Sequence, residues 1–284
     1  MTLKRRPGRM LRGALGLCLA VFLSVLVWMA WHTPRHDRNW ALGQERLARV
    51  DFEGGQVRIH DFRFFRYRPD GTVEKSAYAT RAFRIDDLAS VWLGISHFGR
   101  FGMAHTFMSF GFKDGRYLAI SIEARREKGE GYNPLAGLFR AYELIHVVGD
   151  ERDIVGARSH IRHERVYLYR LNLSPWQAEN LLVKMLTVVN EIYQSPRFYH
   201  TLMDNCITGI VRYAEAIPFC QRWFDYRLLL PGFVDELAYG LGILAGEGTL
   251  SDLQARALIQ TNGYRADDPD FSIKARQEGR PSNP

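Results

Sequence analysis

An uninterrupted apolar segment near the N-terminus constrains this chain more than any other feature of its sequence. Residues Gly13 to Trp31 contain no charged side chain, and a helix of this length spans the hydrocarbon core of a bilayer. Because basic flanks stay in the cytoplasm, we predict a membrane anchor with a cytoplasmic N-terminus and the rest of the chain on the other side. The basic residues that precede the segment, without any acidic residue among them, are Lys4, Arg5, Arg6, Arg9 and Arg12.

A cleavable signal peptide is the alternative interpretation of the apolar segment. The apolar region of a signal peptide is usually shorter, and bulky Trp28 would stand at the minus-three position for cleavage after Ala30. A lipoprotein signal is disfavoured because Leu17 is too large for the position before the lipidated cysteine, and Cys18 lies in the middle of the span. We therefore expect the anchor to be retained.

The formal net charge of +7 belongs mostly to the anchor. Five of these charges precede the apolar segment, so the remaining chain carries +2 and has no basic footprint for nucleic acid. A chain with 46% hydrophobic residues supports one sizeable core over this length rather than two. We predict a cytoplasmic segment at 1–12, the anchor at 13–31, one folded domain at 32–263 and a disordered polar tail at 264–284.

The first half of the domain is predicted to form an antiparallel sheet. The clearest hairpin joins strands at 105–112 and 117–123 through Asp114-Gly115, a dipeptide typical of two-residue turns. In that register His105 pairs with Ala124, and Glu123 points to the opposite face unless a bulge intervenes. Further strands are predicted at 57–67, 72–83, 143–148 and 166–173.

The second half of the domain changes to a helical period. Ser174-Pro-Trp-Gln177 is a capping box, and apolar residues follow at helical spacing until Ser195-Pro196. A second helix is predicted to begin near Asn205 and to stop at Pro218, with shorter helices at 234–245 and 251–260. The chain therefore belongs to the α+β class.

Cys206 has a mechanism attached to its position. A thiol in the first turn of a helix faces unpaired N–H groups, which favour the thiolate and hence a nucleophile. Asn205 is the better cap, because a carboxylate from Asp204 beside the thiol would oppose ionisation. A small buried core residue and a disulfide with Cys220 are the alternatives.

A thiol nucleophile needs a base, and nine histidines offer a choice, each of which could instead be a structural or surface histidine. His105 is one candidate. It opens a hairpin strand and can project from a sheet edge towards a helix start. Glu123 could orient it only if the register allowed. His160 and His163 are three residues apart, but no HExxH or paired-cysteine pattern accompanies them, so we expect neither a metal nor a cofactor.

A dense polar block follows the second hairpin strand, from Ser121 to Tyr132. A solvated charged turn is one interpretation. The other is a loop that binds an anionic headgroup or substrate, with Arg125 and Arg126 as bidentate partners. On this second interpretation the candidate substrate-binding residues are Arg125, Arg126, Glu130 and Tyr132.

Five blocks, in order and with their spacing, resemble the Lnb N-terminal periplasmic domain family. They are HTFMSFGF (105–112), DGRYLAISIEARREKGEGY (114–132), GLFRAYELIHVVGDERD (137–153), VYLYRLNLS (166–174) and PRFYHTLMDNCITGI (196–210). The resemblance extends from about Asn39 to Gly242. It places the family's histidine at His105 and its nucleophile at Cys206. Ile207 and His200 depart from the family pattern, and His200 becomes a second candidate base.

The resemblance implies a permuted papain-like core of the NlpC and lecithin retinol acyltransferase kind. It also implies an inner-membrane-anchored periplasmic enzyme in which Cys206 attacks a carbonyl and His105 handles the proton. Because the domain is tethered beside lipid, we expect acyl groups of a membrane lipid or lipoprotein as substrate, transferred to an amine or to water. A cell-wall or protein amidase and a non-catalytic envelope binding module are the alternatives.

Overall fold

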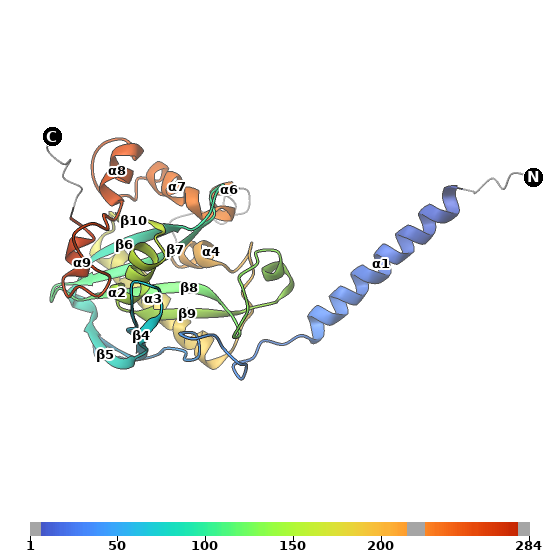
Figure 1. Ribbon diagram of the computed structural model, residues 1–284, viewed down its shortest axis with the longest axis horizontal. Coiled ribbons are helices and arrows are strands. Elements are labelled where there is room, and N and C mark those ends of the chain that lie inside the picture. Colours follow the sequence, from blue (N-terminus) through green and yellow to red (C-terminus); the bar gives the residue numbers. More distant parts are fainter. Residues whose placement is uncertain (1–6, 215–224, 278–284) are drawn as a thin grey trace, which may run out of the picture.

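A long N-terminal helix projects from an α+β domain in the computed structural model, which describes residues 7–214 and 225–277 (Figure 1). Helix α1 runs from Pro7 to Trp31. Its stretch Leu11–Trp31 is long and apolar enough to cross a membrane, and none of it is buried against the domain. The helix therefore fits a single-pass membrane protein.

A mixed sheet forms the centre of the domain. Neighbouring strands are antiparallel except β2 and β9, which run parallel where Arg63 meets Gly149. The prediction of an entirely antiparallel sheet is wrong at this pair. The two backbones approach closely here, because a Cβ on Gly149 would lie 2.4 Å from the Arg63 carbonyl oxygen. The strand order is β1 (Arg49–Glu53), β2 (Gln56–Arg63), β9 (Glu143–Gly149), β8 (Tyr117–Arg125), β7 (Ala104–Phe112), β6 (Leu88–His97) and β10 (Arg165–Arg170), with β5 (Tyr78–Arg84) also paired to β2.

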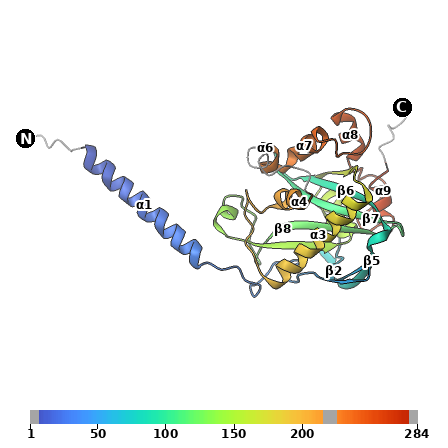
Figure 2. The same ribbon diagram turned by 180° about the vertical axis from the view of Figure 1, so that it is seen from behind.

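Helices cover both faces of this sheet. Helices α3 (Pro175–Gln194) and α4 (Cys206–Ala214) pack on one face, where α3 lies in front in Figure 2. The other face carries a smaller core beneath α2 (Glu151–Ile154), the π-helix η3 (Ala157–Ile161) and α9 (Phe271–Lys274). The remaining elements are the hairpin β3 (Arg66–Tyr67) and β4 (Val73–Lys75), the 3-10 turns η1 (Ile85–Asp87), η2 (Ala136–Phe139) and η4 (Pro231–Phe233), and helices α6 (Tyr226–Leu229), α7 (Val234–Gly240) and α8 (Leu250–Ala257).

Helix α3 forms as its sequence predicts. The Ser174 hydroxyl accepts the Gln177 amide, and the Gln177 side chain accepts the Ser174 amide at 2.9 Å, which completes the capping box. The apolar stripe of the helix is buried against the sheet. Its predicted members are Leu181, Leu182, Met185, Val188, Val189 and Ile192.

The hairpin between β7 and β8 has a different register from the predicted one. Its turn holds three residues rather than two: the Phe112 amide donates to the Arg116 carbonyl, and Gly115 takes a φ of 80°. Phe107 consequently faces Ser121 across the ladder. Continued by two residues, this register aligns His105 with Glu123 and not with Ala124, so the predicted register was wrong by one residue and Glu123 does not point to the opposite face.

The polar segment expected to be a disordered tail packs on the domain as far as Gln277. Phe271 is fully buried in the smaller core, and the Arg276 guanidinium donates to Glu151 at 2.8 Å while lying 3.8 Å from the Tyr117 ring centroid. One buried aromatic ring and one paired cation thus anchor a segment whose composition is otherwise polar. Residues 278–284 lie outside the described part of the chain.

Candidate functional site

Strands β7 and β8 separate at one end of the sheet, and the candidate site occupies this separation. Their mutual ladder ends at Phe107 and Ser121, while β7 continues beside β6 to Ala104 and β8 continues beside β9 to Arg125. A cleft of about 420 Å³ opens here. Both separated strands and the start of α4 contribute to its lining, through Ala104, His105, Ile122, Glu123, Ala124, Asn205 and Cys206.

Cys206 is the first residue of α4, and Asn205 caps this helix. The Asn205 Oδ1 accepts the amides of Ile207 at 3.0 Å and Thr208 at 2.9 Å, while its Nδ2 donates to the Thr201 carbonyl at 2.6 Å. Cys206 is a free cysteine with 5% of its surface exposed. Cys220, its alternative disulfide partner, lies outside the described residues.

Burial raises the pKa of the Cys206 thiol, against the expectation that the helix start would favour the thiolate. The hydroxyl and backbone of Thr106 and the Ile207 amide act in the opposite direction but do not cancel the burial. The thiol is therefore protonated at neutral pH. Any nucleophilic role requires a base that removes this proton during the reaction.

His105 is connected to Glu123 through Ser121. The His105 Nε2 lies 2.7 Å from the Ser121 hydroxyl, which donates to Glu123 Oε1 at 2.7 Å. Arg158 donates to the same carboxylate oxygen at 2.8 Å, and Gln44 donates to the other at 3.2 Å. Although burial opposes it, the Arg158 cation holds the pKa of Glu123 well below its usual range.

These contacts fix the tautomer of His105. An ionised Glu123 can only accept, so the Ser121 proton points to it and the Ser121 oxygen must accept a proton from His105 Nε2. Burial, assisted by Arg158, lowers the pKa of His105 to about 3. The imidazole is therefore neutral, with an unprotonated Nδ1 that can accept a proton.

His105 and Cys206 reach the cleft from opposite faces of the sheet. The His105 ring stacks on Phe107 of the smaller core, with 6.4 Å between centroids, whereas Cys206 belongs to the larger core. Within the described residues no hydrogen bond joins the thiol to the His105 ring. The separation of β7 from β8 is what allows one cleft to be lined by both.

The predicted substrate-binding block divides into two pairs. Arg126 and Tyr132 line the cleft, and the Tyr132 hydroxyl lies 3.1 Å from that of Tyr199. Arg125 does not: it is 2% exposed, donates to the Gln44 and Glu45 carbonyls, and lies 4.0 Å from the Trp40 ring centroid.

The second pair is therefore structural. Arg125 fastens the segment after α1 to the end of β8, because its guanidinium is directed at the Gln44 and Glu45 carbonyls and not into the cleft. Glu130 accepts the Glu127 amide at 2.7 Å and closes a turn.

Other histidines of the described chain have structural surroundings. The Nδ1 of His200, the second candidate base, accepts the Leu202 and Met203 amides at 3.2 Å each and stabilises a turn. His146 is 2% exposed on β9, and neither of its ring nitrogens has a partner among the described residues. In that part of the chain, no cluster of three or more His, Cys, Asp or Glu side chains could hold a metal ion.

Sequence reasoning missed Ser121, Thr106 and Arg158 as parts of this site. Ser121 and Glu123 could have been grouped with His105, since they share one face of the hairpin once the three-residue turn is known. Arg158 carried no such signal. It lies in a connection between two predicted strands, and only the π-helix η3 aims it at the carboxylate.

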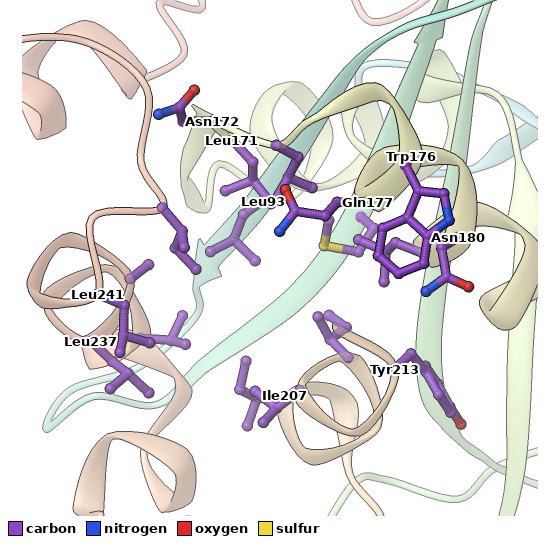
Figure 3. Close-up of a pocket in the computed structure, with 18 residues that line it drawn as sticks. Leu93, Leu171, Asn172, Trp176, Gln177, Asn180, Ile207, Tyr213, Leu237 and Leu241 are labelled. Atoms are coloured by element: carbon purple, nitrogen blue, oxygen red, sulfur yellow. The ribbon is translucent and has the colours of Figure 1, made fainter. Parts of the chain in front are cut away.

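A second pocket, of about 310 Å³, borders the same first turn of α4 (Figure 3). Ile207, the residue after Cys206, lines it together with aliphatic side chains from β6, β7 and α7. Its amide side chains come from the start of α3 and the residues before it, namely Asn172, Gln177 and Asn180. An apolar pocket therefore adjoins the helix start that carries the thiol.

Comparison with known protein families matches residues 74–232 to the Lnb N-terminal periplasmic domain. The matched region contains His105, Ser121, Glu123, Arg158 and Cys206. No curated protein and no solved structure matches the chain.

Proposed function

The chain belongs to the Lnb N-terminal periplasmic domain family, and we propose that it is a cysteine-dependent acyltransferase or hydrolase acting on lipid or lipoprotein acyl groups. One observation carries the proposal: a thiol at a helix start shares a cleft with a neutral histidine whose free nitrogen is fixed by Ser121 and Glu123. A family defined by a periplasmic domain makes this an envelope-associated protein. Helix α1 would span the inner membrane with its N-terminus in the cytoplasm, and the core would be a permuted papain-like one.

The proposed first step is attack of the Cys206 sulfur on the acyl carbonyl carbon. His105 Nδ1 takes the thiol proton, and the carbonyl oxygen becomes an oxyanion. The Cys206 amide, which the Asn205 cap does not use, would stabilise this charge. When the bond to the donor oxygen breaks, the imidazolium protonates the leaving alkoxide and a thioester remains on Cys206.

The second step returns the enzyme to its starting state. An amine or a water molecule attacks the thioester carbonyl, His105 takes the proton from this nucleophile, and the same proton passes to the departing sulfur. In both steps the positive charge on His105 is stabilised by Glu123 through Ser121. Ser121 and Glu123 are therefore positioning residues, and neither touches the acyl group.

Two features of the molecule support a lipid as the acyl donor. The apolar pocket beside Ile207 suits an alkyl chain, and α1 keeps the domain beside a bilayer. An amidase acting on a polar cell-wall or protein substrate is the second candidate. It is favoured by the charged residues Arg126, Arg158, Arg162 and Glu164 in the cleft lining. A binding module without catalysis would need none of the histidine contacts.

Trapping of the acyl intermediate tests the proposal. The full-length protein is incubated with phosphatidylethanolamine vesicles, and intact-mass spectrometry is used to look for an added acyl group. The Cys206→Ser variant should accumulate an acyl ester, whereas Cys206→Ala should carry none. An adduct on Cys206→Ala, or adducts on neither the wild type nor Cys206→Ser, would contradict the nucleophile, and amide cleavage of peptidoglycan fragments would favour the second candidate.

A further inference from the structure

The loops around the mouth of the cleft expose large apolar side chains. Phe101 is 85% exposed, Leu135 69% and Phe139 50%. Single exposed apolar residues are ordinary, but a group of them around one opening marks an interaction surface. We call these exposed side chains the apolar rim, and its members are Phe98, Phe101, Met103, Leu135, Phe139 and Leu230. Phe98, Met103 and Leu230 also line the cleft itself.

The loop that carries Phe101 is held firmly in place. Gly232 donates its amide to the Gly102 carbonyl at 3.0 Å, and a Cβ on Gly232 would lie 2.8 Å from Gly102. Phe101 itself has a φ of 57°, in the left-handed region that strains a bulky L-residue. A fixed loop with a strained residue at its tip thus displays an aromatic ring that is 85% exposed.

The end of α1 is fixed beside the same rim. The Arg140 guanidinium donates to the Met29 carbonyl and lies 5.5 Å from the Phe198 ring centroid. The His32 ring stacks between Trp28 and Phe198, at centroid distances of 4.9 and 5.2 Å. Arg140 follows directly after η2, which carries Phe139, so the membrane helix and part of the rim share one junction.

Helix α1 and the mouth of the cleft lie on the same side of the domain. In Figure 1, α1 leaves the domain on the side where the β8–β9 connection and α6 lie, away from the end that carries α9. The cleft mouth lies at that same side, because its lining includes Tyr132 and Pro134 of the β8–β9 connection and Leu229 of α6. A bilayer crossed by α1 would therefore face the rim.

We propose that the apolar rim inserts into the interfacial layer of the bilayer that α1 crosses, so that the cleft opens directly onto lipid. Aromatic and aliphatic side chains are stabilised at this depth, and the neighbouring Arg100 and Arg140 suit lipid phosphates. The insertion rests on the geometry of the rim and the junction. Only its purpose, the delivery of an acyl donor to Cys206, rests on the proposed function.

Spin labels at the rim test the insertion. The full-length protein, with Cys18, Cys206 and Cys220 replaced by alanine, is placed in nanodiscs of phosphatidylethanolamine and phosphatidylglycerol. Labels are attached in Phe101→Cys, Phe139→Cys and, at the opposite end of the β7–β8 hairpin, Asp114→Cys. Power saturation with oxygen and with a water-soluble nickel chelate should place labels 101 and 139 in lipid and label 114 in water. Labels 101 and 139 that are as accessible to nickel as label 114 would overturn the proposal.

A second measurement asks whether Cys206 is reached from lipid. In a protein whose other cysteines are replaced, the thiol is labelled either with N-ethylmaleimide in water or with a maleimide attached to a lipid headgroup. The Phe101→Asp, Phe139→Asp double variant should slow the lipid-borne reagent about tenfold and leave N-ethylmaleimide unchanged. Ile273→Asp, which places a charge at an exposed apolar side chain of α9, should change neither rate.

The possible outcomes distinguish a failure of the proposed rim insertion from a failure of the proposed nucleophile. Equal rates of lipid-borne labelling in the double variant and the wild type would contradict insertion of the rim. A wild-type thiol that N-ethylmaleimide never labels would contradict the proposed nucleophile, and the spin labels would still decide the insertion.

Discussion

The two faces of the central sheet are stabilised in different ways. The face beneath α3 and α4 is a broad aliphatic core, whereas the face beneath α2, η3 and α9 combines a smaller core with buried ion pairs. These pairs join Arg63 to Asp153 at 2.9 Å, Arg158 to Glu123 at 2.8 Å and Arg276 to Glu151 at 2.5 Å. One face depends on the area that it buries, and the other on complete pairing of its charges.

The candidate site lies where the two faces meet. Cys206 comes from the aliphatic face, and the groups that set the protonation of His105 come from the charged face. The charged face gives His105 its hydrogen-bond partners, and the aliphatic face keeps further buried charges away from the thiol, whose pKa they would alter.

Loss of one buried charge should produce the largest effect on stability. Asp153 is fully buried and accepts two bonds from Arg63, one from the Phe65 amide at 2.8 Å and one from the Tyr67 hydroxyl at 3.0 Å. Asp153→Ala leaves these donors unpaired and should lower the free energy of unfolding by about 3–5 kcal/mol. Urea unfolding of the intact protein in detergent measures this.

The matched truncation on the aliphatic face is Val189→Ala on α3, which should cost about 2 kcal/mol. If Asp153→Ala proved no more destabilising than this change, the contrast between the two faces would be wrong.

Acidification should destabilise the protein through two buried histidines, one towards each face. Burial lowers the pKa of both His105 and His146 to about 3, from an ordinary value near 6.5. Between these values the unfolded chain binds protons that the folded chain does not, so stability falls as the pH falls through 6.5. From pH 7 to 5 each histidine should contribute a loss of about 2 kcal/mol.

The variant His146→Leu isolates one of these contributions. It removes a ring without hydrogen-bond partners from the described structure, so the pH dependence of the melting temperature should become shallower. An unchanged pH dependence would show that His146 does not titrate as its burial requires.

The smallest expected effect concerns the cap of α4. Asn205→Ala removes two bonds to helix amides and should cost about 1 kcal/mol in thermal unfolding. Asn205→Asp should retain the two bonds to the helix amides but lose the bond to the Thr201 carbonyl, and its carboxylate should raise the pKa of the Cys206 thiol further. N-ethylmaleimide labelling of Cys206 at pH 8 should therefore be slower in Asn205→Asp than in the wild type, and faster labelling would contradict the electrostatic role of the cap.

The sequence was sufficient for features that are set locally. The capping box at Ser174, the buried stripe of α3 and the Asn205 cap follow from neighbouring residues, and the structure contains all three. Features that depend on distant partners were missed. Arg158 donates to Glu123, which precedes it by 35 residues in the sequence. Phe271 is buried only because residues from distant elements form the smaller core around it. The burial of Arg125 likewise depends on a segment that precedes it by about 80 residues.

The three-residue turn at Lys113-Asp114-Gly115 has a consequence for how this site can change during evolution. A ladder transmits register without loss, so the length of a turn about ten residues away decides which β8 side chain stands beside His105. A turn that closed on Asp114-Gly115 alone would pair Lys113 with Arg116, shift the register by one residue and align Ala124 instead of Glu123 with His105. Among relatives with a histidine at this position, such a change of turn type would then be expected only where the loss of the carboxylate is tolerated as well.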